Sequence, residues 1–199
     1  MIRLAVLASG GGSNMQTIVD AHKSGVLKGL AEVVLVISNN ANAFVLERAK
    51  KENIKSVYIE RKNFKDEECF NKDIFSRLQG AKTDMVCLAG YLRRIGRDIL
   101  REYKDRILNI HPALLPKFGG EGMYGRYVHE AVVKAGEKKS GATVHFANEE
   151  YDSGEIILQK EVAISEKDTP EDVARRVLEI ERQIYPQAIK KVIEENLRG

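Results

Sequence analysis

Two polar side chains able to take part in chemistry stand two residues apart where an apolar run ends. Residues 107–110 have the pattern of a buried strand, and His111-Pro112 closes it. Asn109 and His111 project to the same face, because side chains alternate along a strand. An amide and an imidazole aimed at one point are suited to holding an oxygen atom that becomes negative during a reaction. The same pair is equally suited to satisfying the backbone of a loop, and the residues alone leave both interpretations open.

A carboxylate is the third candidate group. Asp152 stands in a turn, directly before Ser153-Gly154. A carboxylate close to His111 would favour the charged imidazolium and raise the pKa of the ring towards neutrality or above. An aspartate before Ser-Gly is also typical of an Asx turn, and spacing does not choose between the two uses.

The other histidines have patterns typical of structural residues. His145 falls in an apolar run and is expected to be packed, whereas His22 and His129 are expected on helix surfaces. The four histidines are dispersed and no His-Glu-x-x-His motif occurs. The sequence therefore predicts no metal site.

A glycine loop offers a second kind of site. Gly10-Gly11-Gly12-Ser13-Asn14 lies between an apolar run and a helical pattern. Glycines let backbone N–H groups approach an anion, and a helix N-terminus adds unsatisfied donors. No Gly-Lys-Ser/Thr follows, and Met15 stands where a dinucleotide fingerprint needs its third glycine. The loop predicts a single phosphate, with a ligand-free turn between strand and helix as the alternative.

Alternating patterns along the chain predict the elements that carry these residues. Strands are expected at 4–8, 33–37, 56–59, 85–89, 107–110, 143–147 and 156–162, and helices after residue 13, at 43–51, at 66–78 and from Pro170. Ser13 and Gln16 have capping-box spacing, and Thr169 is expected to cap the last helix. The expected fold is α/β: a Rossmann-like, mostly parallel, twisted sheet with helices on both faces and a C-terminal antiparallel strand addition, in one domain over 1–199.

Composition narrows the possible partners. The 199 residues carry a net charge of +3, with Lys and Arg scattered among Asp and Glu, which is typical of a solvated surface and not of a nucleic-acid binder. Cys69 and Cys87 are isolated, which fits a reducing compartment. No apolar run has the length of a signal peptide core or a membrane span. We expect a cytoplasmic protein with small-molecule substrates, no nucleic acid or membrane partner, and a monomeric or homodimeric state.

Several segments together resemble the folate-dependent formyltransferase family. The segment 109–116, Asn-Ile-His-Pro-Ala-Leu-Leu-Pro, resembles the N-x-H-P-S-L-L-P signature of that family. Further matches, in order along the chain, are residues 8–14, 88–93, 141–146, Asp152-Ser153-Gly154 with Ile157, and Ile184-Tyr185-Pro186. They cover nearly the whole chain, and the combination is specific although each piece alone is weak.

The resemblance implies an activity. The formyl group of 10-formyltetrahydrofolate, a co-substrate used without metal, would pass to the primary amine of glycinamide ribonucleotide in de novo purine (IMP) biosynthesis. The N-terminal half would bind the ribonucleotide, and the C-terminal half would bind folate and carry catalysis.

The resemblance also implies site residues. The catalytic residues would be Asn109, His111 and Asp152. The substrate would be bound by Gly12, Ser13 and Asn14 at its phosphate, by Glu181 at its ribose, and by Lys65 as the nearest candidate for a phosphate-binding cation. The backbone of Leu92, Arg93, Arg94 and Ile95, with that of Asn148, Glu149, Glu150 and Tyr151, would line the folate site.

Departures from the family pattern limit this transfer of roles. Ala113 replaces the usual serine, Arg94 stands where a small apolar residue is common, and the loop from Phe118 to Tyr127 carries extra residues. The length argues against methionyl-tRNA formyltransferase and formyltetrahydrofolate hydrolase, which add a further domain. The alternatives kept are an enzyme like the hydrolase and a non-catalytic nucleotide-phosphate binding module.

Overall fold

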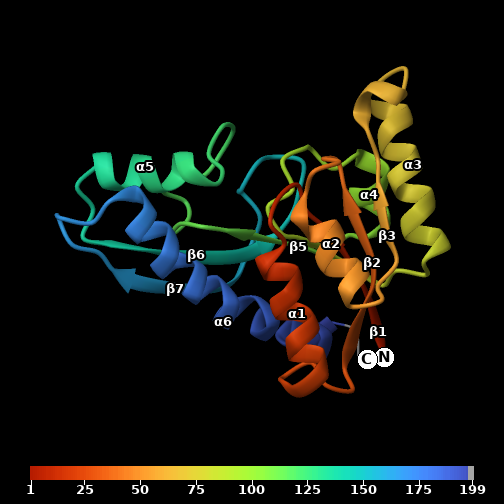
Figure 1. Ribbon diagram of the computed structural model, residues 1–199, viewed down its shortest axis with the longest axis horizontal. Helices are drawn as coiled ribbons and strands as arrows, with labels where there is room; N and C mark the ends of the chain where they lie inside the picture. The colour runs from red at the N-terminus through yellow and green to blue at the C-terminus, as the bar shows by residue number, and fades with distance from the viewer. Residues whose placement is uncertain (197–199) are drawn as a thin grey trace. The chain divides into compact units, whose positions relative to one another are not determined.

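The computed structural model describes residues 1–196, so 197–199 of the predicted domain lie outside the described part. The described residues form seven strands and six α-helices, most of which are labelled in Figure 1. The strands are β1 Ile2–Leu7, β2 Ala31–Ser38, β3 Ser56–Tyr58, β4 Met85–Leu88, β5 Ile107–His111, β6 Lys139–Phe146 and β7 Ile156–Ala163. The helices are α1 Ser13–Ser24, α2 Phe44–Lys51, α3 Glu67–Gly80, α4 Arg97–Glu102, α5 Arg126–Lys134 and α6 Pro170–Asn196, and a 3-10 turn spans Arg61–Asn63.

The α/β class is confirmed. The strand order is β3-β2-β1-β4-β5-β6-β7, mostly parallel with antiparallel strands at the C-terminal side. The chain divides into two compact units, Met1–Leu108 and Asn109–Gly199. That the two act as one formyltransferase domain stays a prediction.

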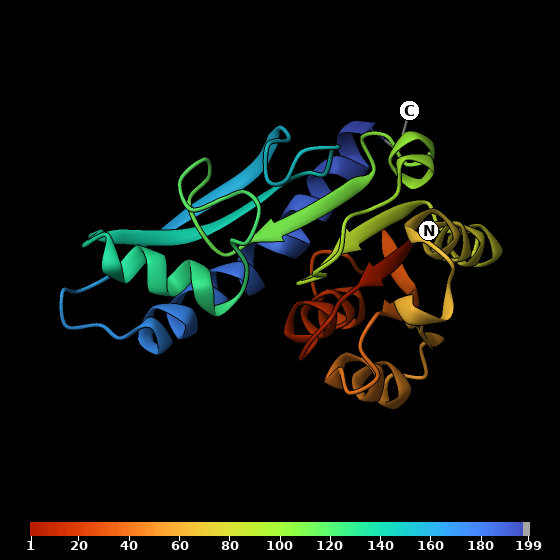
Figure 2. The ribbon, with the colours of Figure 1, turned by 90° about the horizontal axis from the view of Figure 1, so that it is seen from above.

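The first unit is a βαβ arrangement. β1 pairs in parallel with both β2 and β4, and β2 pairs in parallel with β3. Right-handed crossovers place α1 and α2 on one side of these strands and α3 and α4 on the other, as seen from above in Figure 2. A strand covered on both faces needs apolar residues throughout, which is why residues 4–7 are all fully buried.

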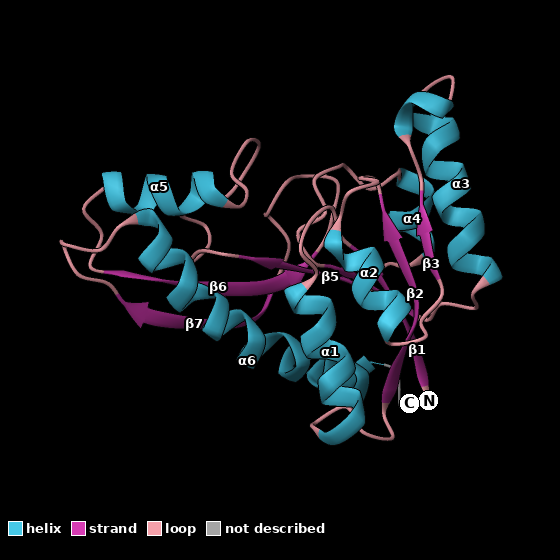
Figure 3. Cartoon of the chain, in the orientation of Figure 1, coloured by secondary structure: helices cyan, strands magenta, loops and turns pink. Residues whose placement is uncertain are grey.

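The second unit is built around an antiparallel pair. β6 and β7 pair with Thr143 opposite Gln159. Helix α6 packs against both strands and against α5 (Figure 3). Its start is the predicted one: Asp172 N–H donates to Thr169 Oγ1 at 3.2 Å, and Thr169 N–H donates back to Asp172 Oδ2 at 3.1 Å.

The structure corrects two local expectations. The capping box at Ser13 and Gln16 is wrong: Gly12 is the N-cap, with φ of 73°, and no side chain caps α1. Because glycine adopts this left-handed backbone without a Cβ clash, the helix already begins at Ser13. The expected surface position of His129 is also wrong: Val128, His129 and Val132 form the buried face of α5.

Candidate active site

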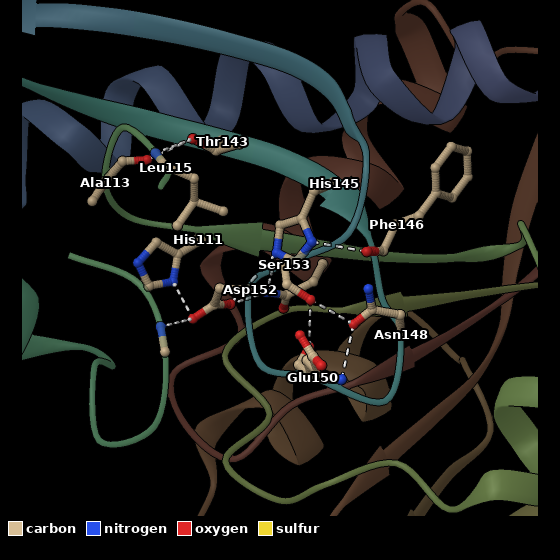
Figure 4. A network of polar contacts seen from close by, with 12 residues as sticks. His111, Ala113, Leu115, Thr143, His145, Phe146, Asn148, Glu150, Asp152 and Ser153 are labelled. Atoms are coloured by element: carbon tan, nitrogen blue, oxygen red, sulfur yellow. Dashed lines mark hydrogen bonds and ion pairs between the residues drawn. The ribbon is translucent and has the colours of Figure 1, made fainter. Parts of the chain in front are cut away.

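The three predicted catalytic side chains meet in the second unit. Asn109 and His111 come from the end of β5, and Asp152 comes from the turn between β6 and β7. His111 Nδ1 lies 3.5 Å from Asp152 Oδ2, and Asn109 Nδ2 donates to Asp152 Oδ1 at 3.3 Å. Figure 4 shows the imidazole of His111 turned towards the Asp152 carboxylate. The carboxylate therefore joins two residues that the strand alone only places side by side.

Asp152 is held as an anion. Its Oδ2 accepts the Gly120 N–H at 3.0 Å, and its side chain is only 10% exposed. Burial raises the pKa of this carboxyl, but the His111 ring and the Gly120 N–H act in the opposite direction, and the pKa lies below its ordinary value. The residue has a φ of 54°, a left-handed conformation that aspartate and asparagine adopt more readily than other side chains.

The His111 ring lies between two acceptors. Its Nε2 is 2.8 Å from the Phe118 carbonyl oxygen, so Nε2 must carry a hydrogen, whereas Nδ1 faces Asp152. Burial lowers the pKa of His111, and the opposing effects of Asp152 and the Phe118 carbonyl do not overcome it. The expected rise in this pKa is therefore wrong for the free protein: the carboxylate acts in the expected direction, but loss of hydration dominates.

Asn109 is oriented by a histidine that the sequence did not suggest as part of the site. His145 Nδ1 lies 2.9 Å from the Phe146 carbonyl oxygen, so Nδ1 carries the hydrogen and Nε2 is an acceptor. Asn109 Nδ2 lies 3.0 Å from that Nε2. If the Asn109 amide were turned over, its oxygen would face two acceptors, His145 Nε2 and Asp152 Oδ1. The NH₂ group is therefore the end of the amide that faces them.

A buried threonine supports the chain that follows His111. Thr143 Oγ1 accepts the Leu115 N–H at 3.1 Å and donates to the Ala113 carbonyl at 2.7 Å (Figure 4). Gln159 Nε2 donates to the same oxygen at 2.9 Å, and Thr143 is fully buried. The Thr143 hydroxyl therefore satisfies two buried backbone groups after His111, the Ala113 carbonyl and the Leu115 N–H.

We expect Thr143→Val to lower the free energy of unfolding by about 2 kcal/mol, because it leaves the Leu115 N–H and Ala113 carbonyl buried without partners. Valine has nearly the same shape, so the loss isolates the hydroxyl. Urea unfolding followed by circular dichroism measures it. Thr143→Ser is the control and should lose less; equal stability of Thr143→Val and wild type contradicts the account.

The glycine loop lies in the first unit and opens α1. The first backbone bond of the helix runs from Gln16 N–H to the Gly12 carbonyl at 3.0 Å, so the N–H groups of residues 13–15 precede the helical ladder. The first turn contains no acidic residue. The loop is tied to neighbouring strand ends, since Ser9 N–H donates to the Gly90 carbonyl and Leu92 N–H donates to Ser9 Oγ at 2.9 Å. This arrangement favours an anion at the start of α1.

Comparison with known proteins decides the family. A family model described as formyl transferase matches residues 2–189. The chain belongs to the formyltransferase family. The resemblance carried by the sequence signatures is thereby confirmed, and so is the class of enzyme, a transferase.

Individual formyltransferases match over almost the whole chain. The phosphoribosylglycinamide formyltransferase of Haemophilus influenzae is 42% identical over 198 residues, covering 100% of this chain and 90% of that protein. The trifunctional purine biosynthetic protein adenosine-3 of Drosophila melanogaster is 38% identical over 96% of this chain, which spans 14% of that protein. The crystal structure of glycinamide ribonucleotide transformylase 1 from Symbiobacterium toebii superposes with a TM-score of 0.89 at 40% identity, covering 96% of this chain and 86% of that chain.

The remaining predicted site residues of the formyltransferase are divided between the units. In the first unit, Lys65 is exposed before α3 and forms no hydrogen bond or ion pair within residues 1–196, and Arg93 directs its guanidinium to Glu67 at 2.6 Å. In the second unit, Glu181 is half-buried on α6. The turn 148–151 is closed by Asn148 Oδ1, which accepts the Glu150 N–H at 2.9 Å.

Two kinds of feature, a metal-binding cluster and a membrane-spanning helix, are absent from the described residues. Over residues 1–196, no three His, Cys, Asp or Glu side chains gather in a way that could hold a metal ion. No helix within the same span is long and apolar enough to cross a membrane.

Sequence reasoning missed the contact of His145 with Asn109 and the burial of His129. His145 and His129 are 2% and 7% exposed, and His129 Nδ1 has no hydrogen-bond partner within residues 1–196. Burial, with the nearby His111, lowers the pKa of His129. The expectation of a surface His129 is therefore wrong. Its place beside two apolar residues of α5, at positions 128 and 132, is the signal that could have indicated it.

The lowered pKa values of His111, His129 and Asp152 make the folded protein less stable in acid. Below about pH 6.5 the unfolded chain protonates its histidines while the folded chain resists protonating His111 and His129, so stability falls as pH falls. Asp152 also stabilises the folded protein less as the pH falls. Its contribution to stability is lost only at lower pH, where the pH passes through the lowered pKa of the folded state. Melting temperatures from pH 8 to pH 5 should therefore decline, and less steeply in His129→Gln. Parallel curves for the two proteins contradict this origin.

Proposed function

We propose that the chain transfers the formyl group of 10-formyltetrahydrofolate to the primary amine of glycinamide ribonucleotide, giving N-formylglycinamide ribonucleotide and tetrahydrofolate. The observation that carries the proposal is the contact of Asp152 with both His111 and Asn109, on residues that match the signature of the family. The name shared by the relatives supports this substrate, and formyl folate is the co-substrate that the family uses.

The reaction needs no nucleophile from the protein. The amine nitrogen attacks the formyl carbon, a carbon–nitrogen bond forms, and the carbonyl electron pair moves onto oxygen. When the tetrahedral intermediate collapses, the bond to the folate nitrogen breaks, and that nitrogen receives the proton that the attacking amine has lost. The protein therefore has to stabilise one negative oxygen and move one proton.

The polar cluster suits both tasks. The Nε2–H of His111 is a donor for the oxygen, which would take the place of the Phe118 carbonyl. Negative charge on that oxygen favours a second proton on the ring, at the Nδ1 that faces Asp152. The Asn109 NH₂ group is a further donor once it exchanges one of its present partners. Asp152, ionised and close to both, is placed to relay the proton from the amine through water.

We propose separate roles for the binding segments. Backbone N–H groups at Gly12, Ser13 and Asn14 would hold the substrate phosphate, and Glu181 would contact the ribose. The backbones of 92–95 and 148–151 would line the folate site. The enzyme would act in the cytoplasm, as a monomer or homodimer and without metal or nucleic acid.

An amine-dependence assay tests the function. Purified protein is mixed with 10-formyltetrahydrofolate, and the difference spectrum of tetrahydrofolate formation is recorded with and without glycinamide ribonucleotide. We expect product only with the ribonucleotide, and none when ribose 5-phosphate, which lacks the amine, replaces it. Product without the amine would indicate the hydrolase alternative, and no product under any condition would indicate the binding module.

A further inference from the structure

Helix α2 contacts the glycine loop at three points, all within the first unit. Val45 N–H donates to the Gly10 carbonyl at 3.1 Å, and Arg48 Nε donates to the Gly11 carbonyl at 2.9 Å. A Cβ added to Gly12 would lie 2.6 Å from Val45 Cγ2, so the loop and the helix are in close contact there as well. Two successive carbonyls of the loop thus point to α2 and are satisfied by it, which fixes the conformation of the loop.

Arg48 carries a positive charge that no carboxylate in residues 1–196 neutralises. Its half-buried side chain uses Nε on the loop, and its guanidinium lies over the Phe44 ring, 5.1 Å from the ring centroid. Several other arginines of this unit are paired with carboxylates, as Arg61 and Arg93 are with Glu67. A carbonyl and an aromatic face stabilise a cation without cancelling its charge, and the terminal nitrogens of Arg48 remain able to donate to an anion.

The proposed phosphate site lacks a cation of its own. The first turn of α1 has no charged side chain, and Lys65, the cation suggested by resemblance, makes no hydrogen bond or ion pair within residues 1–196. Backbone N–H groups supply only partial charge to a phosphate of nearly two negative charges. Arg48 is the guanidinium that the structure attaches directly to the loop.

We propose that Arg48 completes the phosphate-binding site, both by its charge and by holding the Gly11 carbonyl away from the anion. This inference rests on the proposed function, because it assumes that the glycine loop binds the substrate phosphate. Two substitutions separate the contribution of the charge from that of the guanidinium geometry. Lysine at position 48 keeps the charge but loses the planar, multiply donating group, whereas glutamine loses the charge.

Calorimetric titration with ribose 5-phosphate tests the inference without requiring turnover. A charge-assisted contact predicts that Arg48→Gln binds this probe about 10- to 100-fold more weakly than wild type, with a smaller loss in Arg48→Lys. In the formyl transfer assay, KM for glycinamide ribonucleotide should rise in Arg48→Gln with kcat little changed. Arg101→Gln, at an exposed arginine of α4 that pairs with Asp98, is the matched control and should bind as wild type does.

The outcomes separate this inference from the proposed function. Equal binding by wild type and Arg48→Gln, or a loss only in a parallel Lys65→Gln, overturns the role of Arg48 while leaving formyl transfer intact. A fall in kcat with unchanged probe binding also overturns it. Wild-type protein that forms no product refutes the proposed function, whatever the titrations give. Melting curves of each variant confirm that binding is compared between folded proteins.

Discussion

Asp152→Asn should lower kcat by roughly 100- to 1000-fold while the protein stays folded. The substitution removes the negative charge that faces His111 Nδ1 at 3.5 Å and that accepts the Asn109 amide. Asparagine tolerates the left-handed backbone at this position, with its φ of 54°, whereas alanine would add strain. The change therefore tests the charge and leaves the turn intact. Initial rates at saturating substrate, with a melting curve of the same sample, measure both effects.

Asp105→Asn is the matched control for this experiment. Asp105 is an exposed aspartate with almost the same backbone conformation, a φ of 57°. It should keep wild-type turnover, which shows that the loss at 152 comes from the site and not from the type of substitution. A folded Asp152→Asn protein with turnover within about tenfold of wild type would remove the carboxylate from the chemistry.

Gly154→Ala should lower the free energy of unfolding by about 3 kcal/mol and reduce turnover as well. A Cβ at this position would lie 1.7 Å from the Phe146 carbonyl oxygen, so backbone has to move. That carbonyl accepts from His145 Nδ1, and His145 Nε2 in turn accepts from the Asn109 amide. A shift of the Phe146 carbonyl would therefore disturb His145 and, through it, the position of the proposed catalytic residue Asn109. Urea unfolding and initial rates measure the two losses.

Gly80→Ala provides the comparison for the glycine substitution. Gly80 ends α3 with an ordinary φ, and no heavy atom lies within 4 Å of the place where an alanine methyl group would stand. Alanine there should leave stability unchanged or raise it by up to about 1 kcal/mol through helix propensity. A Gly154→Ala protein as stable as Gly80→Ala would show that the turn after β6 adjusts without cost.

Sequence patterns predicted the backbone better than the polar site. The apolar run 4–8 predicted a doubly covered strand because burial on both faces requires such a run, and β1 confirms it. The burial of His129 on α5 was missed, because a polar residue can occupy the apolar face of a helix when its surroundings accept it. Periodicity describes which face a residue lies on, and not the tertiary neighbours that decide whether a polar residue there is buried.

The pKa of His111 illustrates the same limit. The residue types correctly indicated an attraction between an imidazole and a carboxylate, and Asp152 does act that way. How much water each group loses depends on the whole fold, and burial reverses the net direction. His145 shows the complementary case: its strand position was apparent, but its contact with Asn109 required the β5 and β6 residues to be placed together.

The hydrogen bond between His111 and the Phe118 carbonyl has a kinetic consequence. Because the ring nitrogen already has a backbone partner at 2.8 Å, an incoming oxygen atom competes with a peptide group and not with a loosely held solvent molecule. In the proposed reaction, taking over this hydrogen bond would require the chain around Phe118 to shift, and Gly120, two residues further on, donates its N–H to the Asp152 carboxylate. If His111 acts as proposed, the first event at this ring would be the exchange of one hydrogen-bond acceptor for another, and not the filling of an open position.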